Sequence, residues 1–144
     1  MYVDHRKYVD FDGNEREEDF MFLLMESDLI KMNMSVTGGL EKMIRQIISA
    51  QDMPKIYEIF EEIIKKSYGV KSPDGKRFVK TAELTEEYMQ TQAYSDFVTE
   101  LMTNPDVSGE FISKIIPQKL QVEAQKLMAE NPDLKAINGG LTQA

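Results

Sequence analysis

Apolar residues recur at helical spacing along most of the chain. The strongest pattern lies between residues 39 and 69, where two amphipathic helices joined by a very short turn are predicted. Asp52 is placed to cap the second helix, Pro54 falls in its first turn, and Gly69 follows its basic end. The apolar positions of the two helices are Leu40, Met43, Ile44, Ile47, Ile48, Ile56, Ile59, Phe60, Ile63 and Ile64. We predict that this helical hairpin forms the centre of the core.

The N-terminal region has a different, β-like pattern. Residues 1–7 are polar and mixed in charge, so we expect a loose tail there. The turn residues 12–14 separate two candidate strands, residues 8–11 and 15–24. Apolar residues alternate along the second of these segments, as in a half-buried strand. A β-hairpin is therefore predicted.

Cap residues delimit further helices. Ser27 and Thr85 are candidate N-caps, the first of a short helix over residues 28–34 and the second of an apolar stripe that reaches Met102. Residues 90–92 either kink that second helix or divide it in two.

The last predicted helices follow asparagine and proline. Asn104 caps a helix with Pro105 in its first turn, and its apolar positions continue to Ile116. From residue 118 the stripe becomes thinner and indicates a C-terminal helix to about Glu130. The glycine-containing end that follows is predicted to be disordered.

Together these elements predict a mainly α fold, a compact multi-helix domain of five to seven helices with one or two small β-hairpins. We expect the helical domain with its N-terminal hairpin over residues 8–117. A loose tail at 1–7 precedes it, and a C-terminal helix with a disordered end follows at 118–144. The length of 144 residues favours one domain with a modest core.

Composition excludes several classes of protein. The chain is 42% hydrophobic and 29% charged, which is typical of a globular protein, and no apolar run approaches the roughly 20 residues of a transmembrane helix. It has no cysteine, so disulfides and thiolate metal sites are excluded. A net charge of −8 disfavours general binding to phosphate backbones. Ten methionines suit surfaces that adapt to a partner, although methionine also fills gaps in cores.

Candidate chemistry is nearly absent. The only histidine, His5, lies in the predicted tail, so nucleophilic pairs with a histidine base are not expected. Asp10, Asp12 and Asn14 alternate as in a calcium loop, but Gly13 precedes Asn14 instead of following it, and the twelfth position lacks a carboxylate. We predict no enzyme activity, no cofactor and no metal, and instead a protein that binds other proteins.

Two stretches are candidate partner-binding sites. The segment 65–80 is the most basic part of the acidic chain, and it contains a β-turn at 72–75, around which we expect Val70 to pair with residues 78–79. It is either a solvated loop or a docking site for an acidic patch on a partner or on another copy of the chain. Gly38-Gly39 is a candidate hinge at the other edge of the central helical hairpin. The candidate residues are Lys65, Lys66, Lys71, Lys76, Arg77, Lys80, Gly38 and Gly39.

The order of these segments resembles a family of known proteins. Residues 8–20 fit the pattern Tyr-x-Asp-x-x-Gly-x-x-Arg-x-Glu-Asp-Phe, and the loop Ser-Pro-Asp-Gly-Lys-Arg-Phe at 72–78 is the most specific shared feature. Over residues 8–117 the chain resembles tail assembly chaperones of long-tailed phages and prophages of Gram-positive bacteria. The resemblance implies a non-enzymatic protein of the host cytoplasm that binds the tape-measure protein and recruits tail-tube subunits. Such chaperones are often made in two lengths by a programmed frameshift, and this chain would be the shorter product.

Two other functions fit the sequence. The first is a structural component of the virion, such as a tail or head–tail adaptor protein. The second is a small regulator that uses the basic segment to bind nucleic acid. If the protein is a chaperone, we expect its client to contact the edges of the central helical hairpin, namely the basic segment, the Gly38-Gly39 hinge and the C-terminal helix.

Overall fold

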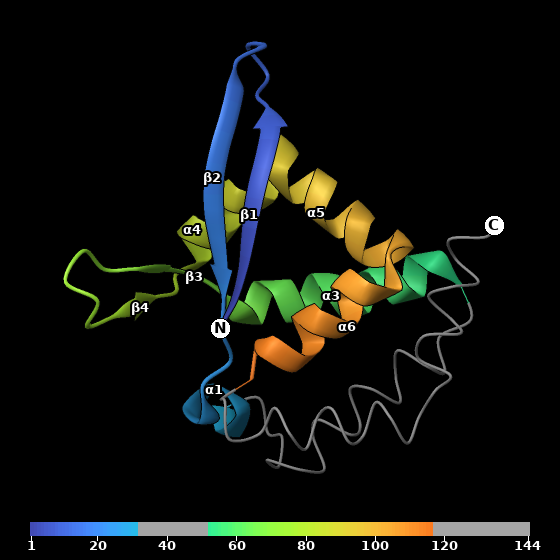
Figure 1. The fold of residues 1–144 in the computed structure, drawn as a ribbon. Coiled ribbons are helices and arrows are strands. Elements are labelled where there is room, and N and C mark those ends of the chain that lie inside the picture. Colours follow the sequence, from blue (N-terminus) through green and yellow to red (C-terminus); the bar gives the residue numbers. More distant parts are fainter. Residues whose placement is uncertain (32–51, 117–144) are drawn as a thin grey trace.

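Two β-hairpins join into one antiparallel sheet in the computed structural model, which describes residues 1–31 and 52–116. The strands lie in the spatial order β1 (Tyr2–Val9), β2 (Glu15–Phe22), β3 (Tyr68–Lys71) and β4 (Phe78–Val79). Met21 pairs with Gly69 and Phe22 with Tyr68, which links the two hairpins. Both predicted hairpins are confirmed, although the first strand is Tyr2–Val9 instead of residues 8–11. β1 and β2 project as a long ribbon beyond the helices (Figure 1).

Five helices accompany this sheet in the described part of the chain. They are α1 (Glu26–Lys31), α3 (Met53–Ser67), α4 (Ala82–Met89), α5 (Gln92–Thr103) and α6 (Pro105–Lys114). The fold is therefore mixed α/β and about half helical. The prediction of a mainly α fold with only small hairpins is wrong in its strand content, because β1 and β2 are eight residues each and belong to a four-stranded sheet. The first helix of the predicted central hairpin, Gly38-Gly39 and residues 118–144 lie outside the described residues.

The prediction that residues 1–7 form a loose tail is wrong, because β1 begins at Tyr2. The Tyr2 ring lies edge-to-face on the ring of Phe111, with centroids 5.3 Å apart. Arg6 donates a hydrogen bond of 2.8 Å to the carboxylate of Glu100 on α5. These partners lie far along the sequence, so the polar character of the segment gave no sign that it would be held in place.

His5 lies on the exposed face of the β1–β2 hairpin, between two carboxylates. Its Nδ1 contacts the carboxylate of Asp19, and its Nε2 lies 2.8 Å from Glu17 Oε1. The hydrogen bond to Asp19, followed by that to Glu17, raises the pKa of His5 above its ordinary value. Folding therefore favours the imidazolium. The resulting stabilisation is complete below about pH 6.5, the pKa of an unfolded histidine, and is lost as the pH rises through the higher folded pKa.

We expect an NMR titration of the His5 ring to give a pKa above that of a free histidine. The variant Asp19→Asn should bring that pKa back down, because it removes the largest cause of the shift. The hairpin should also be less stable at pH 8 than at pH 6, and His5→Gln should remove this difference. A folded-state pKa at or below the unfolded value would contradict the geometry.

Local cap chemistry explains where most helices begin. Asp52 Oδ1 accepts from the backbone N–H of Lys55 at 2.8 Å, which confirms the predicted cap of α3. Asn104 caps α6 in the same way, with Pro105 in the first turn. The stretch 90–92 divides the apolar stripe into α4 and α5, and Thr91 caps the second of these helices.

Two predicted caps are wrong. α4 begins four residues earlier than expected, because the side chain of Thr81 accepts from Leu84 N–H and caps it. Thr85 is instead buried within α4, where its hydroxyl donates to the carbonyl oxygen of Thr81 at 3.1 Å. Ser27 lies inside α1, which begins at Glu26. A residue type that favours N-caps therefore marks the start of a helix only to within a few residues.

Gly69 has a different role from the one predicted. α3 ends at Ser67, and Gly69 lies in β3 rather than at a helix end. A Cβ atom at this position would lie 2.6 Å from Cε2 of Phe78, which is too close for any real contact. Glycine is therefore needed because the aromatic ring of Phe78 packs directly against the backbone.

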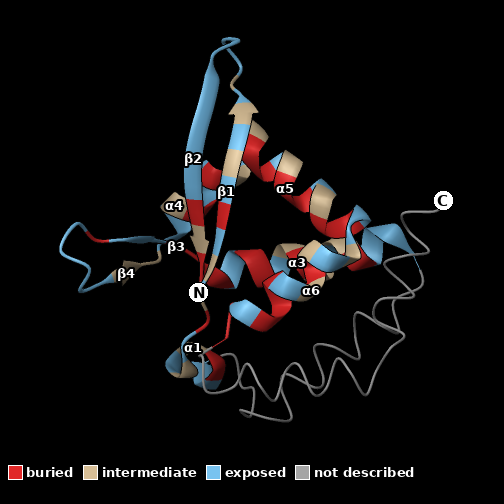
Figure 2. Ribbon diagram, in the orientation of Figure 1, coloured by how far each residue is buried: buried red, intermediate tan, exposed pale blue. Residues whose placement is uncertain are grey.

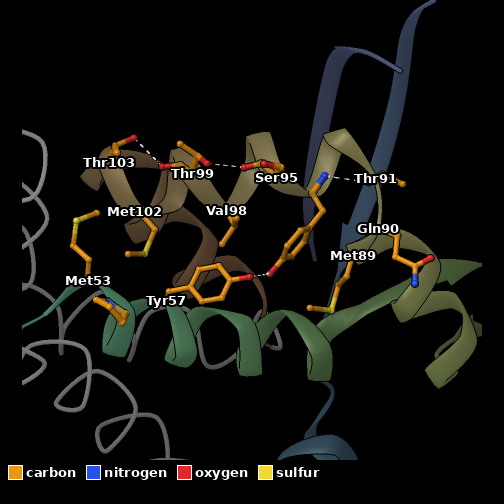
Figure 3. Close-up of a pocket in the computed structure, with 12 residues that line it drawn as sticks. Met53, Tyr57, Met89, Gln90, Thr91, Ser95, Val98, Thr99, Met102 and Thr103 are labelled. Carbon is orange, nitrogen blue, oxygen red and sulfur yellow. Dashed lines mark hydrogen bonds between the residues drawn. The ribbon is translucent and has the colours of Figure 1, made fainter. Parts of the chain in front are cut away.

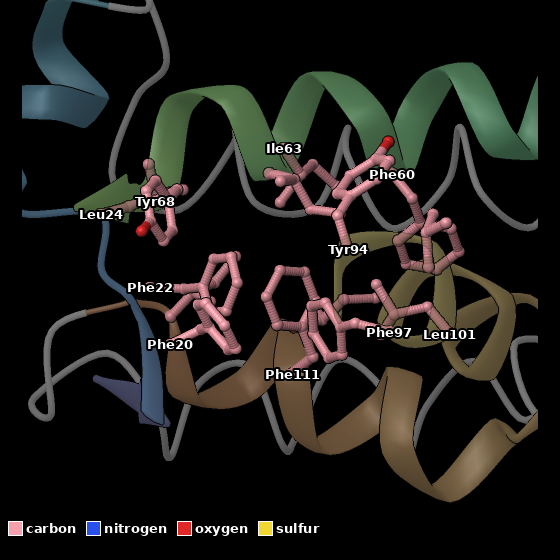
Figure 4. Packing of buried hydrophobic residues seen from close by; sticks show 14 of the residues in the cluster. Phe20, Phe22, Leu24, Phe60, Ile63, Tyr68, Tyr94, Phe97, Leu101 and Phe111 are labelled. Carbon is pink, nitrogen blue, oxygen red and sulfur yellow. The ribbon is translucent and has the colours of Figure 1, made fainter. Parts of the chain in front are cut away.

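The core is centred on an aromatic cluster around Phe22 (Figure 4). Phe22 is fully buried, and its ring centroid lies 5.2 Å from that of Phe97 on α5 and 5.5 Å from that of Phe111 on α6. Buried positions on the sheet and helices face this centre (Figure 2). The apolar face predicted for the second helix of the central hairpin is confirmed, since α3 buries Ile56, Phe60, Ile63 and Ile64.

Candidate functional site: the groove between α3 and α5

The basic residues of the segment 65–80 lie at the end of α3, in β3 and the loop that follows it, and after β4. Lys65 and Lys66 lie in the last turn of α3, where their Nζ atoms are 3.3 Å and 3.9 Å from the carboxylates of Glu61 and Glu62. All four side chains are at least partly exposed, so these ion pairs add little to stability. Both lysines remain accessible to a partner.

Lys80 is a structural residue in this fold. Its Nζ donates to the carbonyl oxygen of Leu23 at 2.6 Å, to Asp28 Oδ2 at 2.8 Å and to the carbonyl oxygen of Lys66 at 3.0 Å. The side chain is only 20% exposed. All three N–H donors are therefore used to connect the end of β2, α1 and the end of α3, and none is left for a partner.

Replacing Lys80 by methionine should lower the free energy of unfolding by about 1–3 kcal/mol, because it removes charge-assisted hydrogen bonds and leaves their acceptors without a donor. Urea denaturation measures this loss. Lys71→Met is the matched control, since Lys71 is exposed and should change stability by less than about 0.5 kcal/mol. An unchanged unfolding curve for Lys80→Met, together with lost partner binding, would instead support the docking role first predicted.

The remaining cations lie at the end of β3 and in the loop that connects it to β4, and we call this segment, residues 71–77, the basic loop. Lys71, Lys76 and Arg77 are exposed, and none of them forms an ion pair within the described ranges 1–31 and 52–116. The loop projects away from the helices on a different side from the β1–β2 hairpin (Figure 1). These three charges are available to an acidic surface.

The backbone of this loop is fixed by its own side chains. The carboxylate of Asp74 accepts from the hydroxyl of Ser72 at 2.7 Å and from the N–H of Lys76 at 3.0 Å. The bond from Ser72 is the largest cause of a lowered pKa of Asp74. Gly75 has a φ of 75°, which the turn requires and other residues rarely adopt. The cations are thus carried by a rigid turn.

A groove of about 590 Å³ runs between α3 and α5 (Figure 3). The first turns of α3 form one wall, α5 forms the other, and the α4–α5 junction closes one end. The lining residues are Met53, Pro54, Tyr57, Met89, Gln90, Thr91, Tyr94, Ser95, Val98, Thr99, Met102 and Thr103. We call this surface the α3–α5 groove.

None of the twelve described residues that line the α3–α5 groove is charged. A random sample of the chain, which is 29% charged, would contain about three or four. Three of the ten methionines lie here, and Met53 is 45% exposed. Depletion of charge with enrichment in methionine and aromatic residues is the composition of the buried centre of protein interfaces.

The threonines of the groove are less polar than their sequence suggests. The hydroxyl of Thr99 donates to the carbonyl oxygen of Ser95 at 2.7 Å, and that of Thr103 donates to the carbonyl oxygen of Thr99 at 2.8 Å. Thr91 likewise donates to Tyr88 in the preceding helix. Because these hydroxyl protons are satisfied within the helices, this wall of the groove can bury apolar groups at low cost.

Two tyrosines meet at the centre of the groove. The hydroxyl oxygens of Tyr57 on α3 and Tyr94 on α5 are 2.8 Å apart and share one hydrogen bond across it (Figure 3). Tyr94 is only 6% exposed, and burial is the largest cause of its raised pKa. Its hydroxyl therefore stays protonated at physiological pH.

The amino-acid sequence alone does not reveal this groove. Met53, Met89 and Met102 come from three different helices, and nothing local shows that they meet. One usable signal was present: Ser95, Thr99 and Thr103 form an uncharged row at four-residue spacing on the exposed side of a helix. Such a row is unusual on the surface of a chain this rich in charge.

Neither metal nor membrane chemistry is indicated by the described residues. In that part of the chain no group of three or more histidine, aspartate or glutamate side chains is placed to hold a metal ion. Within the same residues, every helix is too short or too polar to cross a bilayer.

A family model described as phage tail assembly chaperone matches residues 1–140. The chain belongs to the phage tail assembly chaperone family. The match extends the resemblance seen in the sequence to residues 1–7 and to most of residues 118–144. No curated protein and no solved structure matches the chain. Membership of this family means that the protein is non-enzymatic and that its partners are tail proteins.

Proposed function

We propose that this chaperone binds the tape-measure protein in the host cytoplasm during assembly of a long-tailed phage of a Gram-positive host. It covers apolar helical stripes of this client in the α3–α5 groove and keeps the client soluble until the tail tube forms around it. The proposal rests on one observation above all, the absence of charge from the lining of that groove.

The chemistry of the groove suits a helical client. An amphipathic helix binds by laying its apolar face into a hydrophobic groove. Methionine side chains adapt to apolar stripes of varied shape, which helps a chaperone that must bind many points along one long rod. The net charge of −8 keeps the complex soluble and attracts a helix with basic flanks.

The basic loop supplies a second contact in this proposal. Lys71, Lys76 and Arg77, with Lys65 and Lys66 at the end of α3, dock an acidic surface of the tail-tube protein and recruit it to the client. A rigid turn suits this role, because the cations are ordered before binding. Gly38 and Gly39 remain a predicted hinge outside the described residues.

Co-expression with a tape-measure protein tests the function. We expect the client to remain soluble and to elute together with the chaperone on gel filtration, whereas it should be insoluble when expressed alone. An insoluble client with no complex would refute the proposal. Mass spectrometry of purified virions separates it from a structural role, since an assembly chaperone should be absent from mature particles.

A further inference from the structure

The tyrosine pair in the α3–α5 groove has one hydroxyl proton that is not used in the hydrogen bond between the two residues. Each hydroxyl has one proton, so Tyr57 and Tyr94 together have two, and the hydrogen bond between them uses only one. Neither hydroxyl has another hydrogen-bond acceptor in residues 1–31 and 52–116. One O–H therefore remains as a donor at the centre of an apolar surface.

The unused O–H donor affects affinity only when a partner binds in the groove and excludes water. In the open groove, solvent water can accept the remaining proton. An entirely apolar partner displaces that water and leaves the hydroxyl buried without an acceptor, which weakens binding. A partner with an acceptor at the matching position replaces the lost water and is selected over an apolar isostere.

We propose that the Tyr57–Tyr94 pair selects its partner, an amphipathic helix with a hydrogen-bond acceptor such as a glutamine side chain in the middle of its apolar stripe. Basic residues on the outer face of that helix fit the net charge of −8 of the chaperone. This inference rests on the proposed function, because it takes the α3–α5 groove as the helix-binding site. It adds what that site recognises.

Two synthetic helical peptides of about five turns test the inference. Both have an apolar stripe of leucines and alanines with lysines outside, and they differ only at the central stripe position, which is leucine in one and glutamine in the other. Calorimetry should show that the wild-type chaperone binds the glutamine peptide at least as tightly as the leucine peptide. In an apolar groove without the donor, the glutamine would weaken binding.

The variant Tyr57→Phe with Tyr94→Phe should reverse this preference. Without the donor, the glutamine peptide should bind about fivefold more weakly and the leucine peptide equally well or more tightly, so the ratio of the two affinities changes by at least about fivefold. The single variant Tyr57→Phe keeps one hydroxyl proton and should keep the wild-type preference. Tyr88→Phe is the matched control, since the buried Tyr88 hydroxyl lies outside the groove lining and has no hydrogen-bond partner among residues 1–31 and 52–116.

The outcomes separate the two claims. If wild type binds the leucine peptide more tightly than the glutamine peptide, or if the double variant leaves the ratio unchanged, the selection by the tyrosine pair is wrong while the groove remains the helix site. If neither peptide binds, the groove is not a helix site, and both claims fail. The wild-type comparison decides the matter even if the double variant does not fold.

Discussion

Replacing Met53 by glutamate should weaken binding of a tape-measure helix by at least about tenfold, because an apolar client helix would bury the new carboxylate without a partner. The substitution should not harm the fold. Met53 is 45% exposed and is the first residue of α3, which has no acidic residue in its first turn. A glutamate there interacts favourably with the helix dipole, by about 0.3–1 kcal/mol. The loss of binding thus cannot come from unfolding.

Met25→Glu is the matched control for this experiment. Met25 is exposed to a similar degree, 42%, but lies outside the α3–α5 groove. The measurement is the amount of soluble tape-measure protein that co-purifies with each variant, with circular dichroism as a check on folding. Equal recovery with Met53→Glu and with Met25→Glu would show that the client binds elsewhere, and the basic loop would then be the leading candidate.

Replacing Phe22 by alanine should lower the free energy of unfolding by about 3–5 kcal/mol. Phe22 is fully buried and lies in ring contact with Tyr68, Tyr88, Phe97 and Phe111. Its removal leaves a cavity where β2, β3, α4, α5 and α6 meet, and rigid rings from so many elements cannot all move to fill it. A loss of this size is a large fraction of the roughly 5–15 kcal/mol that holds a domain folded.

Urea denaturation at neutral pH measures this loss. Phe11→Ala is the control, since Phe11 lies at the tip of the β1–β2 hairpin, is 79% exposed and should change stability by less than about 0.5 kcal/mol. A loss below about 1.5 kcal/mol for Phe22→Ala would mean that the aromatic cluster closes around the cavity and is less rigid than its packing indicates.

Most local signals predicted individual elements correctly, with the caps at Ser27 and Thr85 as exceptions. The caps at Asp52 and Asn104, the break at residues 90–92 and both hairpin turns are confirmed, because each depends on side chains within a few residues of the backbone they satisfy. The apolar face of α3 is confirmed for the same reason, since helical spacing alone determines which side chains share a face.

Features that depend on distant partners are not visible in the local sequence. The polar residues 1–7 predict a tail, whereas β1 is held by contacts such as that of Arg6 with Glu100, which lies 94 residues away. The charge of Lys80 is visible in the sequence, but its three acceptors are backbone and side-chain oxygens of other elements. Charge alone does not show whether a lysine faces a partner or its own chain.

The helices and turns of the described residues follow from local sequence, apart from the starts of α1 and α4. The same is true of the lack of a recognisable catalytic motif and of membership of the tail assembly chaperone family. The joining of two hairpins into one sheet and the groove between α3 and α5, whose described lining is uncharged, are visible only in the folded chain. This division reflects the range of the interactions. Caps, turns and helical faces are set within a few residues, whereas strand pairing and groove lining depend on which distant surfaces bury each other.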